Sequence, residues 1–222
     1  MQTPRTSLFP ADLGTLFIDM DGTLTDLAFD RMFFRETLPA RYAAARGLDP
    51  EAAAERVSAE LAAIQGTLPW YSLAHLGRLF GLDLALLTEE FAHDVVLQEG
   101  ALDFLARANA RYRCVLVTNA DPAVLALKLR RTGLADWFDG IISAHHLGAS
   151  KEEPLFYARL EAIEPDCPHA GLLIDDNLHA IAAARRAGLA AVAISRPDLS
   201  QPARQIEDGP VVETIAALIE HL

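Results

Sequence analysis

Hydrophobic and polar positions follow two different patterns along this 222-residue chain. Between about residues 27 and 97, apolar side chains recur at helical spacing and no convincing strand is found. From residue 100 onward, short runs that are apolar at every position alternate with helical stretches. Such runs are typical of parallel strands covered by helices on both faces. In this second part we predict strands at residues 114–117, 140–143, 171–174 and 191–194, and helices at 122–131, 154–163 and 179–187.

Start and stop signals divide the first part into four predicted helices. Asp30 could cap the first, which ends before Gly47, and the Asp49-Pro50 pair starts the second. Residues 66–69 break that helix. The third is expected at residues 70–80, and the fourth opens near residue 83 and ends near residue 97.

A further apolar run, residues 13–18, predicts a buried strand ahead of the four helices. The simplest architecture is then a Rossmann-like α/β core, an open parallel sheet with an inserted four-helix cap. The core would comprise residues 1–26 and 98–222, and the cap residues 27–97. At the C-terminus, residues 211–221 predict a helix with an apolar stripe.

Two carboxylates, Asp19 and Asp21, follow the first predicted strand directly, and Gly22 gives the chain a sharp exit. An Asp-Gly turn would be the ordinary structural interpretation. However, two like charges this close beside a buried sheet repel each other and are poorly solvated. Such a pair persists most easily where a cation or a reaction requires it, so the pattern favours a functional site.

Composition narrows the classes of function. The net charge of −12 argues against nucleic acid and anionic membranes as partners, although a local cation would still admit a small phosphorylated metabolite. With two cysteines, the chain suggests neither a disulfide framework nor a cysteine metal site. We see no apolar signal segment in residues 1–12 and no stretch long enough to span a membrane. These features predict a cytoplasmic protein.

Polar residues also follow two of the later strands. Thr118-Asn119 follows the run at 114–117, Asp175-Asp176 follows the run at 171–174, and Lys151 lies in a loop after the strand at 140–143. Taken singly, the acids could cap a helix, the Thr-Asn pair could form a turn, and the lysine could be solvated. In an open parallel sheet, however, all these groups would meet at the carboxyl edge, where ligands bind.

Four carboxylates at one edge require a positive charge. A hard divalent cation with oxygen ligands, Mg2+ above all, would supply it and would also attract a phosphate. Lys151 could add a further positive charge. The Thr118 hydroxyl and the backbone N–H groups near Asn119 suit an anion.

The set formed by Asp19-x-Asp21-Gly22-Thr23, Thr118-Asn119, Lys151 and Asp175-Asp176 resembles the four motifs of the haloacid-dehalogenase superfamily of phosphohydrolases. The resemblance spans residues 13 to about 194, and the helical insertion is similar to the cap of the superfamily's first subfamily. Four shorter segments resemble the bacterial GMP/IMP 5'-nucleotidases of this superfamily: residues 26–30, 67–71, 81–83 and 128–134.

The resemblance implies a mechanism. Asp19 would attack the phosphorus of a phosphomonoester and form an aspartyl-phosphate, and Asp21 would serve as the general acid and base. Mg2+ would be held by Asp19, by the backbone carbonyl of Asp21 and by the Asp175-Asp176 pair. Lys151, together with Thr118 and Asn119, would bind the phosphoryl oxygens, and Lys151 would also restrain Asp19. The dehalogenases that named the superfamily lack the second acid of the first motif, so Asp21 favours phosphoryl transfer.

The preferred substrate implied by the closer resemblance is a purine 5'-nucleotide, IMP or GMP. Sugar phosphates or phosphoglycolate, hydrolysed by a phosphatase or moved by a phosphomutase, are the alternative, and a non-catalytic binding protein is a more distant one. Cap aromatics could stack on a purine base, although core packing is the commoner role of such residues. The candidate cap contacts are Phe34, Trp70 and Tyr71, followed by Arg31, Arg35 and His75, whereas His145 and His146 are expected in a core loop without a role.

Overall fold

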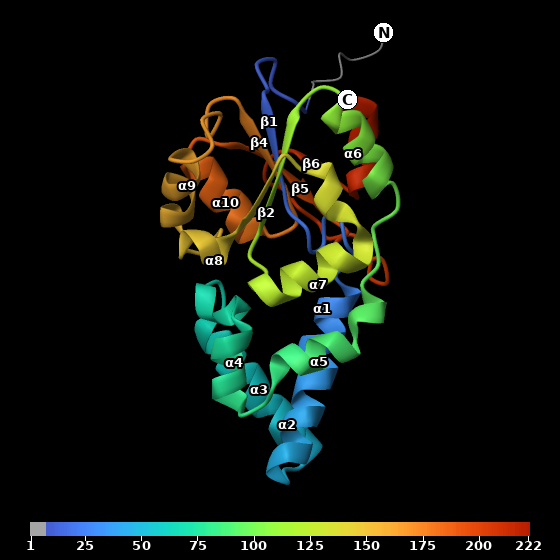
Figure 1. Cartoon of the computed structure of the whole chain (residues 1–222), viewed down its shortest axis with the longest axis vertical. Helices are drawn as coiled ribbons and strands as arrows, with labels where there is room; N and C mark the ends of the chain where they lie inside the picture. The colour runs from blue at the N-terminus through green and yellow to red at the C-terminus, as the bar shows by residue number, and fades with distance from the viewer. Residues whose placement is uncertain (1–7) are drawn as a thin grey trace.

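The computed structural model describes residues 8–222 and shows a parallel sheet between helices, with a helical segment beyond one end of the strands (Figure 1). Six strands lie in the order β3-β2-β1-β4-β5-β6, and every neighbouring pair is parallel. β1 is therefore central, and the chain order reverses on either side of it. This arrangement confirms the predicted open α/β fold. Residues 1–7 of the predicted core lie outside the described residues.

Five of the strands agree with the sequence prediction to within two residues. They are β1 (Thr15–Ile18), β2 (Arg113–Thr118), β3 (Gly140–Ser143), β4 (Gly171–Asp175) and β5 (Ala190–Ile194). The sixth, β6 (Val211–Val212), was not predicted, and the expected helix over residues 211–221 is wrong at its start. Residues 210–212 instead supply backbone acceptors to the edge of β5, and a 3-10 helix, η5 (Ile215–His221), follows.

Helices cover both faces of the sheet. Leu16 and Ile18 of β1 belong to a core cluster shared with α6 (Ala101–Asn109) and η5, while Phe17 belongs to a second cluster shared with α9 (Pro154–Glu161) and α10 (Leu178–Arg186). This alternation along one strand is what a doubly covered sheet requires. The remaining helices of this part are α7 (Pro122–Thr132), η4 (Leu134–Trp137) and α8 (Ala144–Leu147), and α8 contains the two histidines that we expected in a loop.

Residues 28–94, which we call the helical segment, contain helices and turns and no strand. The first helix is continuous but changes type, from α1 (Ala28–Met32) through a π-helical stretch, η1 (Phe33–Thr37), to α2 (Leu38–Arg46). The others are α3 (Pro50–Ile64), η2 (Leu68–Tyr71), α4 (Leu73–Phe80), α5 (Leu84–Glu90) and η3 (Ala92–Asp94). A separate buried cluster, including Leu38, Val57, Leu76 and Phe80, holds them together.

Several helix boundaries in this segment differ from the prediction. Asp49 caps α3 and Gly47 ends α2 in a left-handed conformation, as expected. Asp30, however, lies inside α1, where its side chain binds a lysine instead of capping the helix. The third helix begins after the Ser72 cap, because residues 68–71 form a 3-10 turn. The fourth ends at Glu90 rather than near residue 97.

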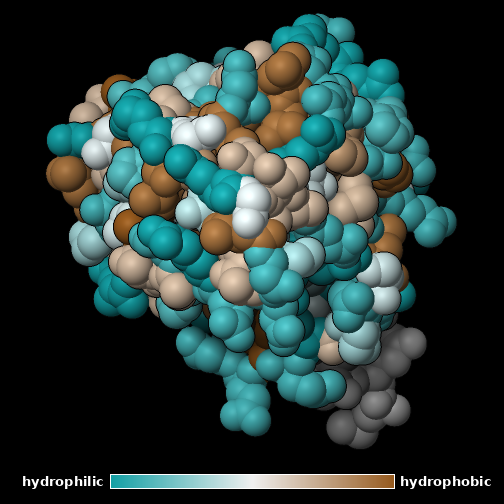
Figure 2. Space-filling view, turned by 90° about the horizontal axis from the view of Figure 1, so that it is seen from below, coloured by the Kyte–Doolittle hydropathy of each residue, from teal (hydrophilic) through white to brown (hydrophobic). Residues whose placement is uncertain are grey.

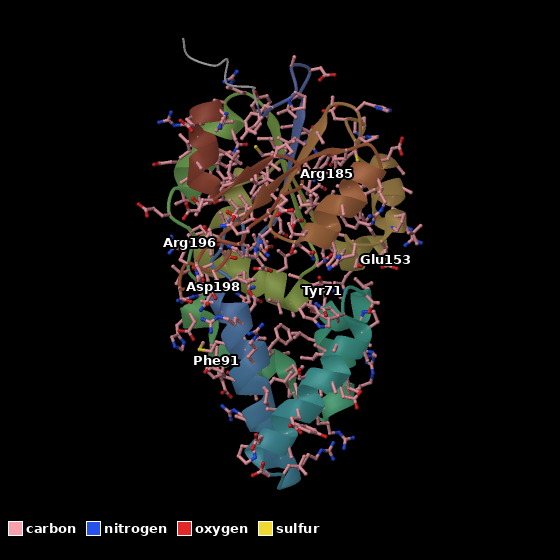
Figure 3. All side chains as sticks on the ribbon, turned by 180° about the vertical axis from the view of Figure 1, so that it is seen from behind. Tyr71, Phe91, Glu153, Arg185, Arg196 and Asp198 are labelled. Atoms are coloured by element: carbon pink, nitrogen blue, oxygen red, sulfur yellow. The ribbon has the colours of Figure 1, made fainter. Side chains whose placement is uncertain are left out.

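Two connections join the helical segment to the sheet. The Asp26 N–H donates to the Val96 carbonyl, so the segment that leaves the sheet and the segment that returns to it lie side by side. On the same boundary, Arg31 of α1 donates to Asp198 at 2.6 Å, and Tyr71 lies at another point of contact (Figure 3). Seen from the end of the segment, hydrophobic residues are interspersed with hydrophilic ones (Figure 2). Among the described residues, none of the helices is both long and apolar enough to cross a membrane.

Candidate active site

The carboxyl ends of three adjacent strands bring the predicted site residues to one edge of the sheet. Ile18 at the end of β1 lies between Leu116 of β2 and Ile174 of β4. Each of these strands is then followed by polar residues, and all of them except Asp21 are buried. They are Asp19 and Asp21 after β1, Thr118 and Asn119 at the end of β2, and Asp175 and Asp176 at the end of β4.

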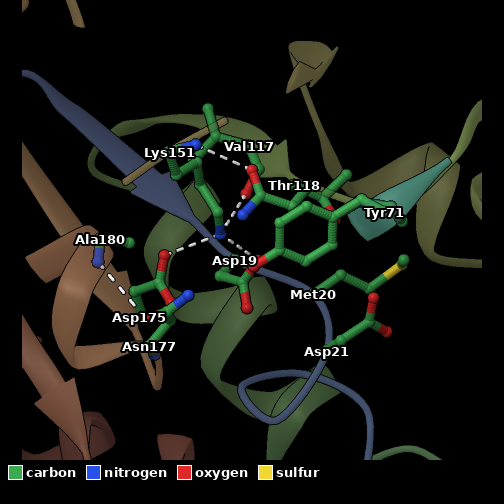
Figure 4. A network of polar contacts seen from close by, with 12 residues as sticks. Asp19, Met20, Asp21, Tyr71, Val117, Thr118, Lys151, Asp175, Asn177 and Ala180 are labelled. Carbon is green, nitrogen blue, oxygen red and sulfur yellow. Dashed lines mark hydrogen bonds and ion pairs between the residues drawn. The ribbon is translucent and has the colours of Figure 1, made fainter. Parts of the chain in front are cut away.

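Lys151 lies at the centre of this edge (Figure 4). Its ammonium group donates to Asp19 Oδ1 at 2.5 Å, to Asp175 Oδ2 at 2.7 Å and to the Val117 carbonyl at 3.3 Å. The backbone N–H of Lys151 also donates to Asn119 Oδ1 at 2.9 Å, which fixes the loop that carries it. The side chain is 2% exposed, so this lysine is a buried counter-ion and not a solvated surface charge.

Three carboxylates share this small buried space. Oxygen atoms of Asp19, Asp175 and Asp176 lie within 4.8 Å of one another. Burial raises the pKa of Asp19 well above its ordinary value, with the neighbouring acids acting in the same direction against Lys151. Burial likewise raises the pKa of Asp175, and burial together with Asp175 raises that of Asp176 to about 7. Arg204 lies 3.6 Å from Asp176 Oδ2 as a second cation, yet it and Lys151 together leave the pKa of all three acids raised.

This charge imbalance is what a divalent cation would correct. Oxygen ligands from several carboxylates are the donor set that hard cations such as Mg2+ prefer, and their proximity fits one shared ion. Gly22 lies close against the same acids, because a Cβ at this position would come within 2.7 Å of Asp176 Cγ. The residues at this edge thus fit a metal centre of the kind the sequence predicts.

Asp21, the second acid of the pair, faces a different partner. Its Oδ1 accepts from Lys128 Nζ at 2.6 Å and from the Thr25 hydroxyl at 3.1 Å. Lys128 also binds both carboxylate oxygens of Asp30, at 2.7 and 2.9 Å. Burial would lower the pKa of Lys128, but the two carboxylates outweigh it and raise the pKa, so the side chain is an ammonium ion. In Figure 4 the Asp21 carboxylate accordingly lies apart from Lys151.

Tyr71 is the residue through which the helical segment contacts the site. Its hydroxyl donates to Glu152 Oε1 at 2.5 Å, and burial together with the Glu152 carboxylate raises the Tyr71 pKa. Glu152 also accepts from the side-chain amides of Asn119 and Asn177, at 2.9 and 2.8 Å. One carboxylate therefore joins the ends of β2 and β4 to the helical segment, beside Lys151.

The predicted aromatic residues form one group at this boundary. The rings of Phe34 and Trp70 stack with centroids 5.4 Å apart, and Trp70 meets Tyr71 edge-on at 4.7 Å. All three side chains are partly exposed. Of the other candidate contacts, Arg31 is paired with Asp198, Arg35 is exposed and His75 is partly exposed on α4.

A comparison with protein families decides the classification. Residues 13–188 match the family model described as haloacid dehalogenase-like hydrolase, which is most of the chain. The chain belongs to this family. This confirms the resemblance drawn from the motifs and identifies the protein as a hydrolase enzyme.

Individual relatives within the haloacid dehalogenase-like hydrolases narrow the class. The chain is 34% identical over 215 residues to the GMP/IMP nucleotidase YrfG of Escherichia coli K12, covering 95% of this chain and 96% of the relative. The protein of the same name from Shigella flexneri matches equally. These matches confirm the prediction of a phosphatase-type enzyme that resembles nucleotidases.

Solved structures of the family share the fold. A HAD phosphatase from Thermococcus onnurineus has a TM-score of 0.75 at 24% identity, with 94% of this chain and 96% of that chain covered. The L-2-haloacid dehalogenase of Xanthobacter autotrophicus has a TM-score of 0.61 at 19% identity, with 94% and 97% covered. Because one fold serves both phosphatases and dehalogenases, the chemistry must be argued from the site residues.

Sequence reasoning assigned no role to two residues of this site. Lys128 was noted only within a segment of family resemblance, yet it shares the buried face of α7 with Val124 and Leu125, which is an unusual position for a lysine. That placement is a signal the pattern could have given. Glu152 follows Lys151 directly, and nothing in its sequence context indicates that two asparagines and a tyrosine converge on it.

Proposed function

We propose that this protein is a Mg2+-dependent phosphomonoester hydrolase that works through an aspartyl-phosphate on Asp19, with the purine 5'-nucleotides IMP and GMP as substrates. The observation that carries the proposal is the pairing of Lys151 with Asp19 and Asp175 inside a cluster of three buried acids. A nucleophilic carboxylate, a buried counter-ion and a surplus of acid ligands are the parts that phosphoryl transfer needs.

Asp19 and Asp21 carry out the two chemical steps of this proposal. An Asp19 oxygen bonds to phosphorus as the bond between phosphorus and the leaving oxygen breaks, and Asp21 gives that oxygen its proton. Asp21 then takes a proton from the water that attacks the aspartyl-phosphate, which releases inorganic phosphate and frees Asp19. Thr118, the backbone of Asn119 and Lys151 bind the phosphoryl oxygens. The presence of Asp21 separates this scheme from ester formation at carbon.

The metal site of the proposal uses Asp19, the backbone carbonyl of Asp21, Asp175 and Asp176. When bound there, Mg2+ would neutralise the charge that develops on the phosphoryl group and offset the repulsion between phosphate and carboxylates. The raised pKa of Asp176, about 7, supports this assignment because burial and the neighbouring Asp175 disfavour its ionised form, which a bound cation would stabilise.

Two observations support a purine nucleotide as the substrate. The relatives with 34% identity are named GMP/IMP nucleotidases and match along 95% of this chain. In addition, the partly exposed rings of Phe34 and Trp70 stack at 5.4 Å beside Tyr71, which reaches the site. A flat purine base could stack on such a group while its 5'-phosphate lies near Lys151.

The helical segment would act as a cap on a core of residues 1–26 and 98–222. Its two connections, near Asp26 and residues 97–100, lie side by side and provide a place for a hinge. The arrangement in this structure, with Tyr71 against Glu152, would be the closed one, and it would exclude water from the phosphoryl site. A small metabolite as substrate, no nucleic-acid or membrane partner and a cytoplasmic location complete the proposal.

Phosphate release from a panel of substrates tests this function. The panel comprises IMP, GMP, AMP, CMP, several sugar phosphates and phosphoglycolate, each with Mg2+ and with a chelator. We expect Mg2+-dependent turnover with the highest kcat/KM for IMP and GMP, and none in Asp19→Asn. Preference for a sugar phosphate or phosphoglycolate would refute the purine assignment, and turnover that persists in Asp19→Asn would refute the nucleophile.

A variant pair tests the base contact separately. Trp70→Leu removes the exposed ring next to Phe34, whereas Trp137→Leu removes a tryptophan of η4 that packs against the sheet core. We expect Trp70→Leu to raise KM for IMP by roughly 5- to 100-fold, the effect of losing about 1–3 kcal/mol of base stacking. KM for a ribose phosphate without a base should stay unchanged. Equal effects on both substrates would rule out stacking on Trp70.

A further inference from the structure

Lys128 is a buried cation that the reaction scheme above does not use. It projects from α7 of the core, and its side chain is 1% exposed. Its ammonium group has three N–H donors, and the surrounding acceptors are Asp21 Oδ1 at 2.6 Å and both oxygens of Asp30. The ring of Phe29 lies 4.9 Å away as a further contact. Its donors are thus directed at Asp21 and Asp30, which leaves it poorly placed to bind phosphate itself.

The contacts of Lys128 fix one oxygen of Asp21 and leave the other available. Oδ1 accepts from Lys128 and lies 3.1 Å from the Thr25 hydroxyl, which shares its one proton between Asp21 and the Met20 carbonyl. No hydrogen bond to Oδ2 is found within the part of the chain that the structure describes. A carboxylate held in this way cannot rotate freely. The proton that Asp21 exchanges with substrate or water would then pass through Oδ2, which belongs to the same rigid carboxylate group and is therefore fixed together with Oδ1.

The other partners of Lys128 belong to the helical segment. Asp30 and Phe29 lie on α1, the first helix after the Asp26 connection, whereas Lys128 and Asp21 belong to the core. The Asp21–Lys128–Asp30 cluster therefore crosses the boundary between the sheet and the helical segment. Figure 1 shows α7 and α1 next to each other at this boundary. A shift of α1 would move Asp30, whose carboxylate holds the Lys128 ammonium group in place.

We propose that Lys128 is a positioning residue for Asp21, and that Asp30 makes this positioning depend on the seating of the helical segment. The proposal rests on the proposed function, in which Asp21 exchanges protons. Its rival is a structural ion cluster that only stabilises the fold. Burying a lysine between two partly buried acids is costly, and apolar side chains would stabilise such a boundary as well or better, which favours the positioning role.

Charge-matched variants separate the two roles. Lys128→Met leaves two partly buried acids facing each other without a counter-ion, so it should lower stability as well as activity. The double variant Lys128→Met with Asp30→Asn restores the original net charge of the cluster without restoring the contact to Asp21. Lys128→Arg keeps a cation that can still donate to Asp21. Arg131→Met, an exposed position of the same helix, is the matched control.

The decisive readout compares leaving groups in presteady-state and steady-state kinetics. We expect Lys128→Met and the double variant to lower kcat for a nucleoside monophosphate by roughly 10- to 100-fold, while KM changes less than about 3-fold. This loss in kcat would be part of the roughly 10²–10⁴-fold rate enhancement that general acid–base catalysis contributes. An aryl phosphate needs no proton on its leaving group. Both variants should therefore release a burst of aryl alcohol equal to the enzyme concentration, followed by slow turnover.

Several outcomes would overturn the proposal. Recovery of wild-type kcat in the double variant, alongside recovered thermal stability, would show that the cluster is structural. Equal loss of burst and steady-state rate would show that the phosphoryl site itself is damaged. If Lys128→Met does not fold, Thr25→Val removes the other donor to Asp21 Oδ1 and should lower kcat in the same way; an unchanged kcat there would contradict the positioning role. Wild-type enzyme and Asp19→Asn run in parallel, so failure of the proposed function appears as an inactive wild type.

Discussion

The pH dependence of stability tests the acidic cluster most sharply through Asp176. Burial and the neighbouring Asp175 raise its pKa from 3.8 to about 7, against the opposing effect of Arg204. Over that interval the folded protein retains a proton that the unfolded chain has released. Because the folded state binds more protons, its stability without metal must fall as the pH rises from about 4 to about 7.

The size of the effect follows from the same numbers. Each pKa unit corresponds to about 1.4 kcal/mol, so the change from 3.8 to about 7 amounts to roughly 4 kcal/mol in all. Roughly 2 kcal/mol of this falls between about pH 5 and about pH 7, because the folded protein releases half of the proton by about pH 7. In a chain of this length 1 kcal/mol moves Tm by about 2–4 °C. The chelated protein should therefore lose roughly 4–8 °C across this range.

Thermal unfolding followed by circular dichroism, in chelator and in Mg2+ across this pH range, measures the effect. Asp176→Asn should lose the share of the pH slope that Asp176 contributes and gain stability in chelator near pH 7, while Asp19 and Asp175, whose pKa values are also raised, keep the rest of the slope. Glu207→Gln, at an exposed acid, should behave as wild type. Mg2+ should stabilise wild type more as the pH rises, because it replaces the protons. A flat or rising Tm for chelated wild type, or an equal slope in Asp176→Asn, would refute the reasoning.

Three further predictions concern neighbouring residues. Lys151→Met removes the counter-ion that Asp19 and Asp175 share, so it should lower the free energy of unfolding in chelator by about 3–5 kcal/mol. Urea denaturation near pH 7 measures this loss, and a loss below about 1 kcal/mol would contradict a buried ion pair. Gly22→Ala should lower the apparent affinity for Mg2+ at least about 10-fold in Mg2+ titrations of thermal stability, because φ is +85° and the new Cβ would lie 2.7 Å from Asp176 Cγ. Gly133→Ala, also at positive φ but with no atom within 4 Å of the new Cβ, is the control for backbone strain. Tyr71→Phe should raise KM by roughly 10- to 150-fold while kcat stays within about 3-fold, because Glu152 keeps two amide donors and only the hydrogen bond from the helical segment is lost, worth about 1.5–3 kcal/mol. A matching fall in kcat would place Tyr71 in the chemistry instead.

Patterns of apolar residues predicted the sheet well because each strand is covered on both faces. A run such as Leu172–Ile174 must be apolar at every position, which leaves a strong signal in the sequence. The two-residue strand β6 carries no such signal, since it is defined only by its pairing with the edge of β5. Similarly, Asp30 looks like a helix cap in the sequence, and only the approach of Lys128 from another helix shows its actual partner.

The candidate site was predictable to the extent that it lies at strand ends. Parallel strands bring their last residues to one edge, so Asp19, Thr118 and Asp175 could be grouped from the sequence. The contacts made by side chains from elsewhere could not be predicted in this way. Lys128 reaches Asp21 across 107 positions of the chain, and Tyr71 reaches Glu152 across 81. The first contact depends on how α7 packs beside the sheet edge and the second on how the helical segment sits on the sheet, and periodicity encodes neither.

Trapping the covalent intermediate tests the central proposal most directly. Wild-type enzyme is mixed with IMP carrying a radiolabelled phosphate in Mg2+, quenched in acid within a single turnover, and digested for peptide mapping by mass spectrometry. The proposal predicts one labelled peptide, with the phosphoryl group on Asp19, and no label in Asp19→Asn. Release of labelled phosphate without a covalent adduct at any quench time, or an adduct on another residue, would contradict it.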